Sequence, residues 1–157
     1  MSSSSSNSNH GNHTLVMFII MLLAGFLSTM NVWADKLSDI RLFHLNDIYM
    51  ILLMTGWMFL FMGIYYTNML QLVLGLIMVV VMLVAIRYQL FIGQEQYLKG
   101  MIPHHSMAVL MSKELLRKNS GSNAAGGKVV LDDEILGLAK SIINGQEKEI
   151  GLMTKYV

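Results

Sequence analysis

Three long runs of apolar residues are separated by short polar stretches in the first part of the chain. The runs cover residues 15–34, 48–66 and 69–86, and none of them contains Asp, Glu, Lys or Arg. At about 1.5 Å of rise per residue, helices of these lengths can cross a hydrocarbon core of roughly 30 Å. The pattern therefore predicts a transmembrane region of three helices over residues 15–88.

The polar stretches around these runs are predicted to lie outside the bilayer. Residues 1–14 are rich in Ser, Asn, His and Gly, which bury too little apolar surface to offset chain entropy, so we expect a disordered tail. Residues 35–47 carry Lys36, Asp39 and Arg41 and are too charged to remain in lipid. We expect this second stretch to be a loop that could be partly helical.

Residues 89–157 show the pattern of amphipathic helices in water. Residues 89–100 are predicted to be a polar connector that extends the third helix. Pro103 fits the first turn of a new helix, where its missing N–H costs nothing, and this helix is predicted over residues 104–118. Its expected apolar face consists of Ala108, Met111 and Leu115.

A second amphipathic helix follows a loop at residues 119–128 that is rich in Ser, Asn and Gly. Asp132 and Asp133 favour its positive N-terminal end, and it is predicted to run to about Lys155. One stripe carries Ile135, Ala139, Ile142, Gln146, Ile150 and Met153. The predicted fold class is thus all-α, with three transmembrane helices followed by a small C-terminal helical hairpin.

Charge and composition exclude several classes of function. The net charge is only +1 and the basic residues are scattered, which argues against a nucleic-acid partner. The chain has no cysteine, so disulfides, thiolate zinc sites and thiol catalysis are excluded. With 54% hydrophobic and 13% charged residues, against about 25% charged in soluble domains, the bilayer itself is the expected partner.

The basic residues near the spans predict an orientation. Lys36, Arg41, Arg87 and Lys99 fall on one side, which the positive-inside rule assigns to the cytoplasm together with the C-terminal domain. An alternative is that the first run is a cleaved signal peptide, because Val32 and Ala34 stand where small residues precede a cleavage site. The run is long and no Lys or Arg precedes it, so an uncleaved span is favoured.

Histidine and methionine gather at residues 101–111, in the string MIPHHSMAVLM. On a helix His104, Met107 and Met111 share one face, with Met101 and His105 paired beside it. Imidazole binds several transition metals, whereas thioether selects for Cu(I), so the mixture favours copper. On the second helix Gln146, Glu149 and Met153 share a stripe that could approach the first.

This string, with the second-helix pattern that includes Ala139, Gln146 and Met153, resembles the bacterial family called "domain of unknown function 305". The resemblance covers about residues 95–157 and implies ferritin-like helical packing and a role in copper tolerance. A subgroup of that family is similar to the whole chain, with three spans before the motif. The ligands implied are His104, His105, Met101, Met107, Met111 and Met153, with Gln146 and Glu149 as secondary candidates.

The leading hypothesis is a membrane-anchored copper-binding accessory protein of a bacterial inner membrane, with a second copy or a copper-handling protein as partner. The alternative is a structural or interaction module whose histidines and methionines only pack. A ferritin-like oxidase would need Glu-x-x-His pairs, which this sequence lacks, so we expect no enzyme. A cysteine-free site suits the periplasm better than the cytoplasm, which conflicts with the charge rule. His10 and His13 have a spacing that could capture metal, but a disordered polar tail is the favoured explanation of both.

Overall fold

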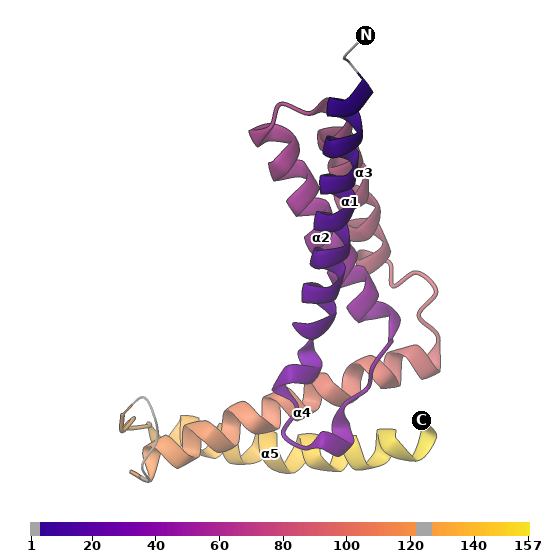
Figure 1. Cartoon of the computed structure of the whole chain (residues 1–157). Coiled ribbons are helices and arrows are strands. Elements are labelled where there is room, and N and C mark those ends of the chain that lie inside the picture. Colours follow the sequence, from indigo (N-terminus) through magenta and orange to yellow (C-terminus); the bar gives the residue numbers. More distant parts are fainter. Residues whose placement is uncertain (1–3, 122–126) are drawn as a thin grey trace. The chain divides into compact units, whose positions relative to one another are not determined.

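The structure is a computed structural model that describes residues 4–121 and 127–157 (Figure 1). Over these residues the regular structure is helical and contains no strand, which confirms the predicted all-α class. The chain forms two compact units. The first contains the residues up to Thr29 together with Leu45–Phe91, and the second contains Met30–His44 and Ile92–Val157.

The first unit consists of α1 (Ser4–Leu27), α2 (Leu45–Tyr65) and α3 (Met69–Arg87). Three helical stretches, His13–Trp33, Leu45–Tyr65 and Met69–Arg87, are long and apolar enough to cross a membrane. No more than 33% of any of them is buried within the protein, so most of their apolar side chains face outward. The structure therefore confirms three helices of membrane-spanning length and composition.

The N-terminal segment differs from the prediction. Residues 1–3 lie outside the described residues, but from Ser4 to Thr14 the backbone is helical and continues into the apolar part of α1. The disordered tail predicted for residues 1–14 is therefore wrong for this part. The prediction rested on composition, which indicates how much apolar surface a segment can bury. A polar segment can still be helical when it extends an existing helix, because each added residue gains one backbone hydrogen bond.

A tight turn joins α2 to α3 at Thr67 and Asn68, and the side chain of Asn68 accepts hydrogen bonds from the first turn of α3. Beyond the turn the two helices approach each other closely. A Cβ atom on Gly63 would lie 2.4 Å from the backbone nitrogen of Leu72, and one on Gly75 would lie 2.4 Å from that of Leu60. Since real Cβ atoms do not come this close, glycine is required at both crossings.

The start of the motif helix also differs from the prediction. After α3 the backbone is left-handed at Gln89 and Phe91, which prevents the helix from continuing. A new helix, α4 (Gln94–Asn119), then begins nine residues before Pro103. Residues 89–100 thus do not extend the third helix, and Pro103 lies inside α4 instead of in its first turn. Inside a helix proline removes one hydrogen bond of the ladder and its ring crowds the carbonyl of the residue four positions earlier, which is why the sequence favoured a helix start here.

The second unit is built on α4 and α5 (Asp133–Met153), which lie side by side in opposite directions as the predicted hairpin (Figure 1). A 3-10 turn, η3 (Thr154–Tyr156), follows α5. The face of α4 that packs is not the predicted one, since Met111 is 56% exposed. The buried positions instead are Ile102, Pro103, His105, Ser106, Val109 and Ser112. On α5, Ala139 and Met153 are buried as predicted, whereas Ile135 is exposed.

The segment between α1 and α2 is a partly helical loop, as the sequence allowed. It contains two 3-10 turns, η1 (Met30–Trp33) and η2 (Leu37–Asp39), which both contact α4. Hydrogen bonds within the segment also shape it, since the backbone N–H of Arg41 donates to Oδ1 of Asn31 at 2.7 Å. Residues 30–44 therefore belong to the unit that carries the histidine motif.

Candidate functional site: the paired histidines and their polar support

His105 is the buried member of the histidine pair and is held on both sides of its ring. Nδ1 lies 2.8 Å from the backbone oxygen of Met101, one helical turn earlier, and Nε2 lies 2.8 Å from Oε2 of Glu149 on α5. Both partners are hydrogen-bond acceptors, so the ring of His105 lies between the carbonyl of its own helix and a carboxylate of α5. Glu149, with a side chain 57% exposed, keeps contact with water.

His104 is exposed but lies next to this pair. The two imidazole rings have centroids 6.0 Å apart and are inclined at 66°. The structure therefore places His104 beside the contact between His105 and Glu149, which are all predicted candidates.

The methionine candidates lie in different environments. Met101 and Met107 are half-buried, Met111 is on the surface, and Met153 is 9% exposed within the hairpin. Within the described parts of the chain, no group of three or more His, Asp or Glu side chains is arranged to hold a metal ion. The predicted set is therefore spread from the surface of α4 to the core of the hairpin.

Three further candidates are Gln146, His13 and His10. Oε1 of Gln146 is buried and accepts no hydrogen bond from the described residues. His13 belongs to the other unit, on α1, and lines a hollow there. His10 lies within the helical backbone of α1, and its side chain is outside the described part of the structure.

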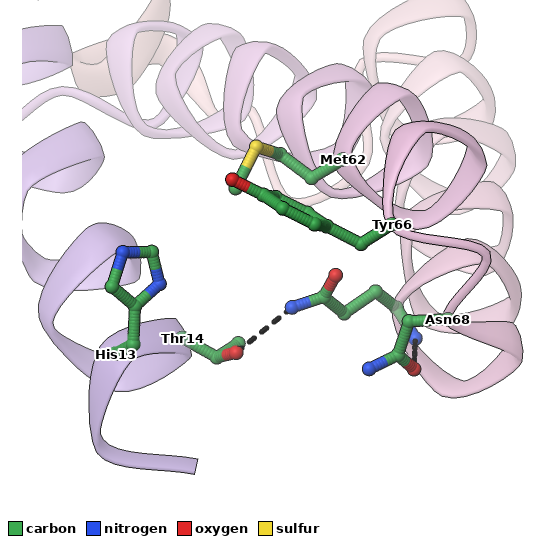
Figure 2. A pocket seen from close by; sticks show the side chains of 6 residues that line it. His13, Thr14, Met62, Tyr66 and Asn68 are labelled. Carbon is green, nitrogen blue, oxygen red and sulfur yellow. Dashed lines mark hydrogen bonds between the residues drawn. The ribbon is translucent and has the colours of Figure 1, made fainter. Parts of the chain in front are cut away.

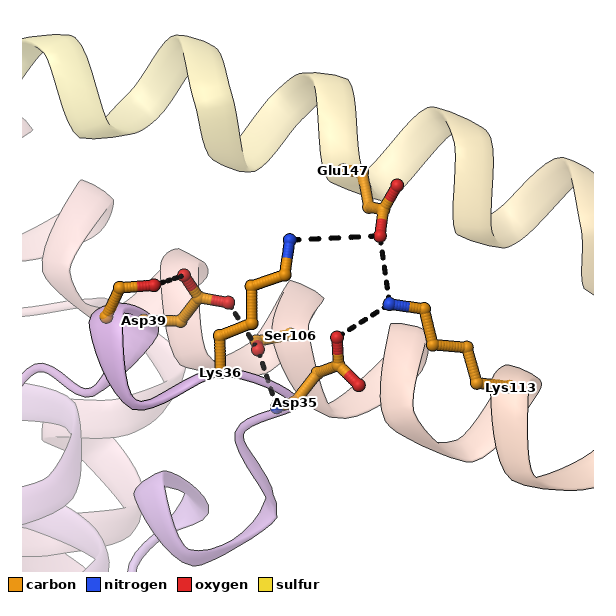
Figure 3. A network of polar contacts seen from close by, with 7 residues as sticks. Asp35, Lys36, Asp39, Ser106, Lys113 and Glu147 are labelled. Atoms are coloured by element: carbon orange, nitrogen blue, oxygen red, sulfur yellow. Dashed lines mark hydrogen bonds and ion pairs between the residues drawn. The ribbon is translucent and has the colours of Figure 1, made fainter.

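A polar cluster that the sequence did not reveal fastens residues 30–44 to the motif (Figure 3). Ser106, the residue after the histidine pair, is completely buried. Its hydroxyl donates to Oδ2 of Asp39 at 2.7 Å and accepts the backbone N–H of Asp35 at 2.8 Å. The hydroxyl of Ser38 adds a third bond, to Oδ1 of Asp39 at 3.1 Å. The motif helix and the inter-span segment are thus joined at a buried point.

Lys113 extends this cluster to α5. Its Nζ lies 2.7 Å from Oδ2 of Asp35 and 2.9 Å from Oε1 of Glu147 (Figure 3). The Nζ of Lys36 lies 4.0 Å from the same oxygen of Glu147. The hydrogen bond with Asp35, and then that with Glu147, raises the pKa of Lys113 above its usual value of 10.5. The resulting stability is present below that value and is lost as pH rises through the raised pKa. Because the pair is partly exposed, it contributes only about 0–1 kcal/mol.

Comparison with known proteins identifies the family to which the chain belongs. Residues 93–157 match the family described as "Domain of unknown function (DUF305)", which confirms the predicted family for the C-terminal unit. A protein of Acanthamoeba polyphaga mimivirus, named as an uncharacterized protein, is 44% identical to this chain over 91% of its length and 90% of that protein's length. No solved structure matches, so ferritin-like packing stays a prediction.

The mimivirus relative also bears on the expected source. It gives no support to a bacterial inner membrane, because the similar protein comes from a virus. At 91% coverage of this chain, the similarity extends through both units. The chain belongs to the same family as the mimivirus protein, and its residues 93–157 form a DUF305 domain.

Proposed function

We propose that the chain is a membrane-anchored copper-binding accessory protein that buffers copper or contributes to copper tolerance, without catalytic turnover. The observation that supports it best is the setting of His105. Metal-binding imidazoles commonly donate one ring N–H to a backbone carbonyl, which fixes the ring and directs the other nitrogen to the metal. His105 makes this bond to the carbonyl of Met101, with His104 as its neighbour.

Glu149 must change its role when copper binds. Its carboxylate occupies the direction of Nε2, so the ion either displaces it or includes it as a ligand. Displacement is sterically simple because Glu149 is largely exposed on α5. Either route uses Nε2 in its unprotonated form, since only the unprotonated nitrogen binds a metal.

The proposed oxidation state of the copper ion follows from the methionine candidates. Carboxylate is a hard ligand, whereas thioether favours Cu(I), and four methionine candidates flank the histidines in the sequence or on α5. We propose Cu(I) held by His104 and His105 with thioethers from Met101 or Met107, which are neighbours of the pair on α4. Met111 at the surface and Met153 in the hairpin are the outer members of the same proposed set.

One observation favours the alternative, a structural module without a metal. Both ring nitrogens of His105 already have partners, and such a pair can simply join α4 to α5. In that case the histidine pair would have the same type of role as Ser106, which joins α4 to residues 30–44.

The test is anaerobic titration of the purified full chain in detergent with Cu(I), in competition with a chromophoric chelator, at several pH values. We expect one ion per chain, held with an affinity that falls on acidification, because protons compete with metal ions for imidazole nitrogens. If the chain takes no Cu(I) from a weak chelator at any pH, the structural module is the correct reading.

We further propose that the C-terminal unit faces the cytoplasm, on the basis of the charge rule. The opposite side is the alternative, because thiol-free sites compete poorly with cytosolic thiols. The chain has no cysteine, so a single introduced one can be labelled selectively. In sealed cells a membrane-impermeant maleimide should label Met69→Cys and should reach Val130→Cys, on an exposed position, only after permeabilisation. The reverse pattern would place the unit on the exported side.

A further inference from the structure

The three-helix unit contains a polar hollow at one end, between α1 and the turn that joins α2 to α3. Its volume is about 390 Å³, and Figure 2 shows side chains of α1 facing those around the turn across it. The lining residues are His13, Thr14, Met62, Tyr66, Asn68 and Gln71. None of these described residues is Lys, Arg, Asp or Glu, so their side chains offer hydrogen-bonding groups without a permanent charge.

Gln71 gives this hollow a specific chemical requirement. Its Nε2 donates to Oγ1 of Thr14 at 2.8 Å, which fixes the amide in place (Figure 2). Its Oε1 is buried and accepts no hydrogen bond from any described residue. Leaving a buried acceptor without a donor is unfavourable, so the position suits a ligand that supplies a hydroxyl or an N–H.

A second hollow adjoins the first, because Thr14 lines both. It has a volume of about 310 Å³ and is otherwise lined by Leu15, Phe18 and Phe59. The rings of Phe18 and Phe59 stack with centroids 5.7 Å apart, so α1 and α2 present an aromatic wall there. The two hollows together therefore change from polar to apolar along the side of the helical unit.

We propose that these adjoining hollows form one binding site for a membrane lipid with an uncharged, hydroxyl-bearing headgroup, such as a monoacylglycerol or diacylglycerol. The hydroxyl donates to Oε1 of Gln71, and the hydrocarbon chain lies against Phe18 and Phe59. Each hollow falls in the size range of small-molecule sites, about 300–1,000 Å³. The described lining contains no Lys or Arg that would pair with a phosphate headgroup. The proposal is independent of copper binding, because all its residues belong to the three-helix unit.

The test uses the full chain in detergent and a monoacylglycerol with a photoreactive diazirine in its acyl chain. After irradiation, mass spectrometry of peptides should locate the label near Phe18 or Phe59. Excess unlabelled monoacylglycerol should compete for labelling, whereas lysophosphatidylglycerol of the same chain length should compete poorly. Equal competition by the anionic lipid, or label spread evenly over the outward faces of the three helices, would overturn the proposal.

Variants separate headgroup recognition from general affinity for apolar surfaces. Gln71→Leu removes the acceptor and should lower labelling roughly five- to tenfold, the effect of losing one hydrogen bond. Gln94→Leu, at an exposed glutamine at the start of α4, should leave labelling unchanged. If Gln71→Leu also alters the fold, judged by circular dichroism, Phe59→Trp is the second variant. It should block the apolar hollow while Gln71 is retained, and undiminished labelling of a folded Phe59→Trp protein would contradict the site.

Discussion

Replacing both His104 and His105 by alanine is expected to abolish stoichiometric Cu(I) binding by the full chain. The variant keeps every methionine candidate, but isolated thioethers hold the ion too weakly to compete with a chelator. The loss is measured in the same anaerobic competition titration as for the unmodified protein. His13→Ala is the matched control, because it removes a histidine from the other unit and should leave this binding unchanged.

Single variants distinguish ligation from packing. His104 is exposed, so His104→Ala should change the free energy of unfolding by no more than about 0.5 kcal/mol while it weakens copper binding. His105→Ala also removes the bonds to Met101 and Glu149 and should cost about 1–3 kcal/mol. Copper affinity that is unaffected by His104→Ala would exclude the paired site. A melting temperature lowered by His105→Ala alone, with no copper bound by either protein, would support the structural module.

The parts of the fold that the sequence predicts are those that depend on one segment at a time. A membrane-length helix needs only a sufficiently long apolar run, so the three stretches in 15–34, 48–66 and 69–86 could be placed before the structure was known. The start of α4 could not be predicted from the sequence, because it depends on left-handed backbone at Gln89 and Phe91. Neither residue type is a usual signal for that conformation.

The candidate site also contains some features that the sequence predicts and others that it does not. The sequence placed His105 and Glu149 on two facing helices, and the structure joins them at 2.8 Å. It did not predict that Met111 would be exposed, because the packed face of α4 is fixed by what covers it. That cover includes residues 30–44, which are far away in the sequence. The bond between Ser106 and Asp39 spans 67 positions, and a lone serine and a loop aspartate carry no pattern that pairs them.

Ser106→Ala is expected to detach residues 30–44 from α4 and to destabilise the C-terminal unit. The change removes the hydroxyl that donates to Asp39, a carboxylate only 7% exposed, and that accepts the N–H of Asp35. A buried polar group that loses its partner costs about 1–3 kcal/mol. Thermal unfolding should therefore occur at lower temperature. Ser112→Ala, at another buried serine of α4 that is outside this cluster, is the matched control and should have the smaller effect.

Hydrogen exchange and a double variant test the mechanism of this destabilisation. In Ser106→Ala the amide of Asp35 should exchange faster with solvent, since its acceptor is gone, while amides of α2 and α3 should be unaffected. Adding Asp39→Ala to Ser106→Ala should cost little more than Ser106→Ala alone, because the carboxylate that lost its donor is removed as well. The two residues contact each other directly, so their effects should be coupled. Strictly additive effects in the double variant would show that the 2.7 Å bond between Ser106 and Asp39 does not hold the segment on α4.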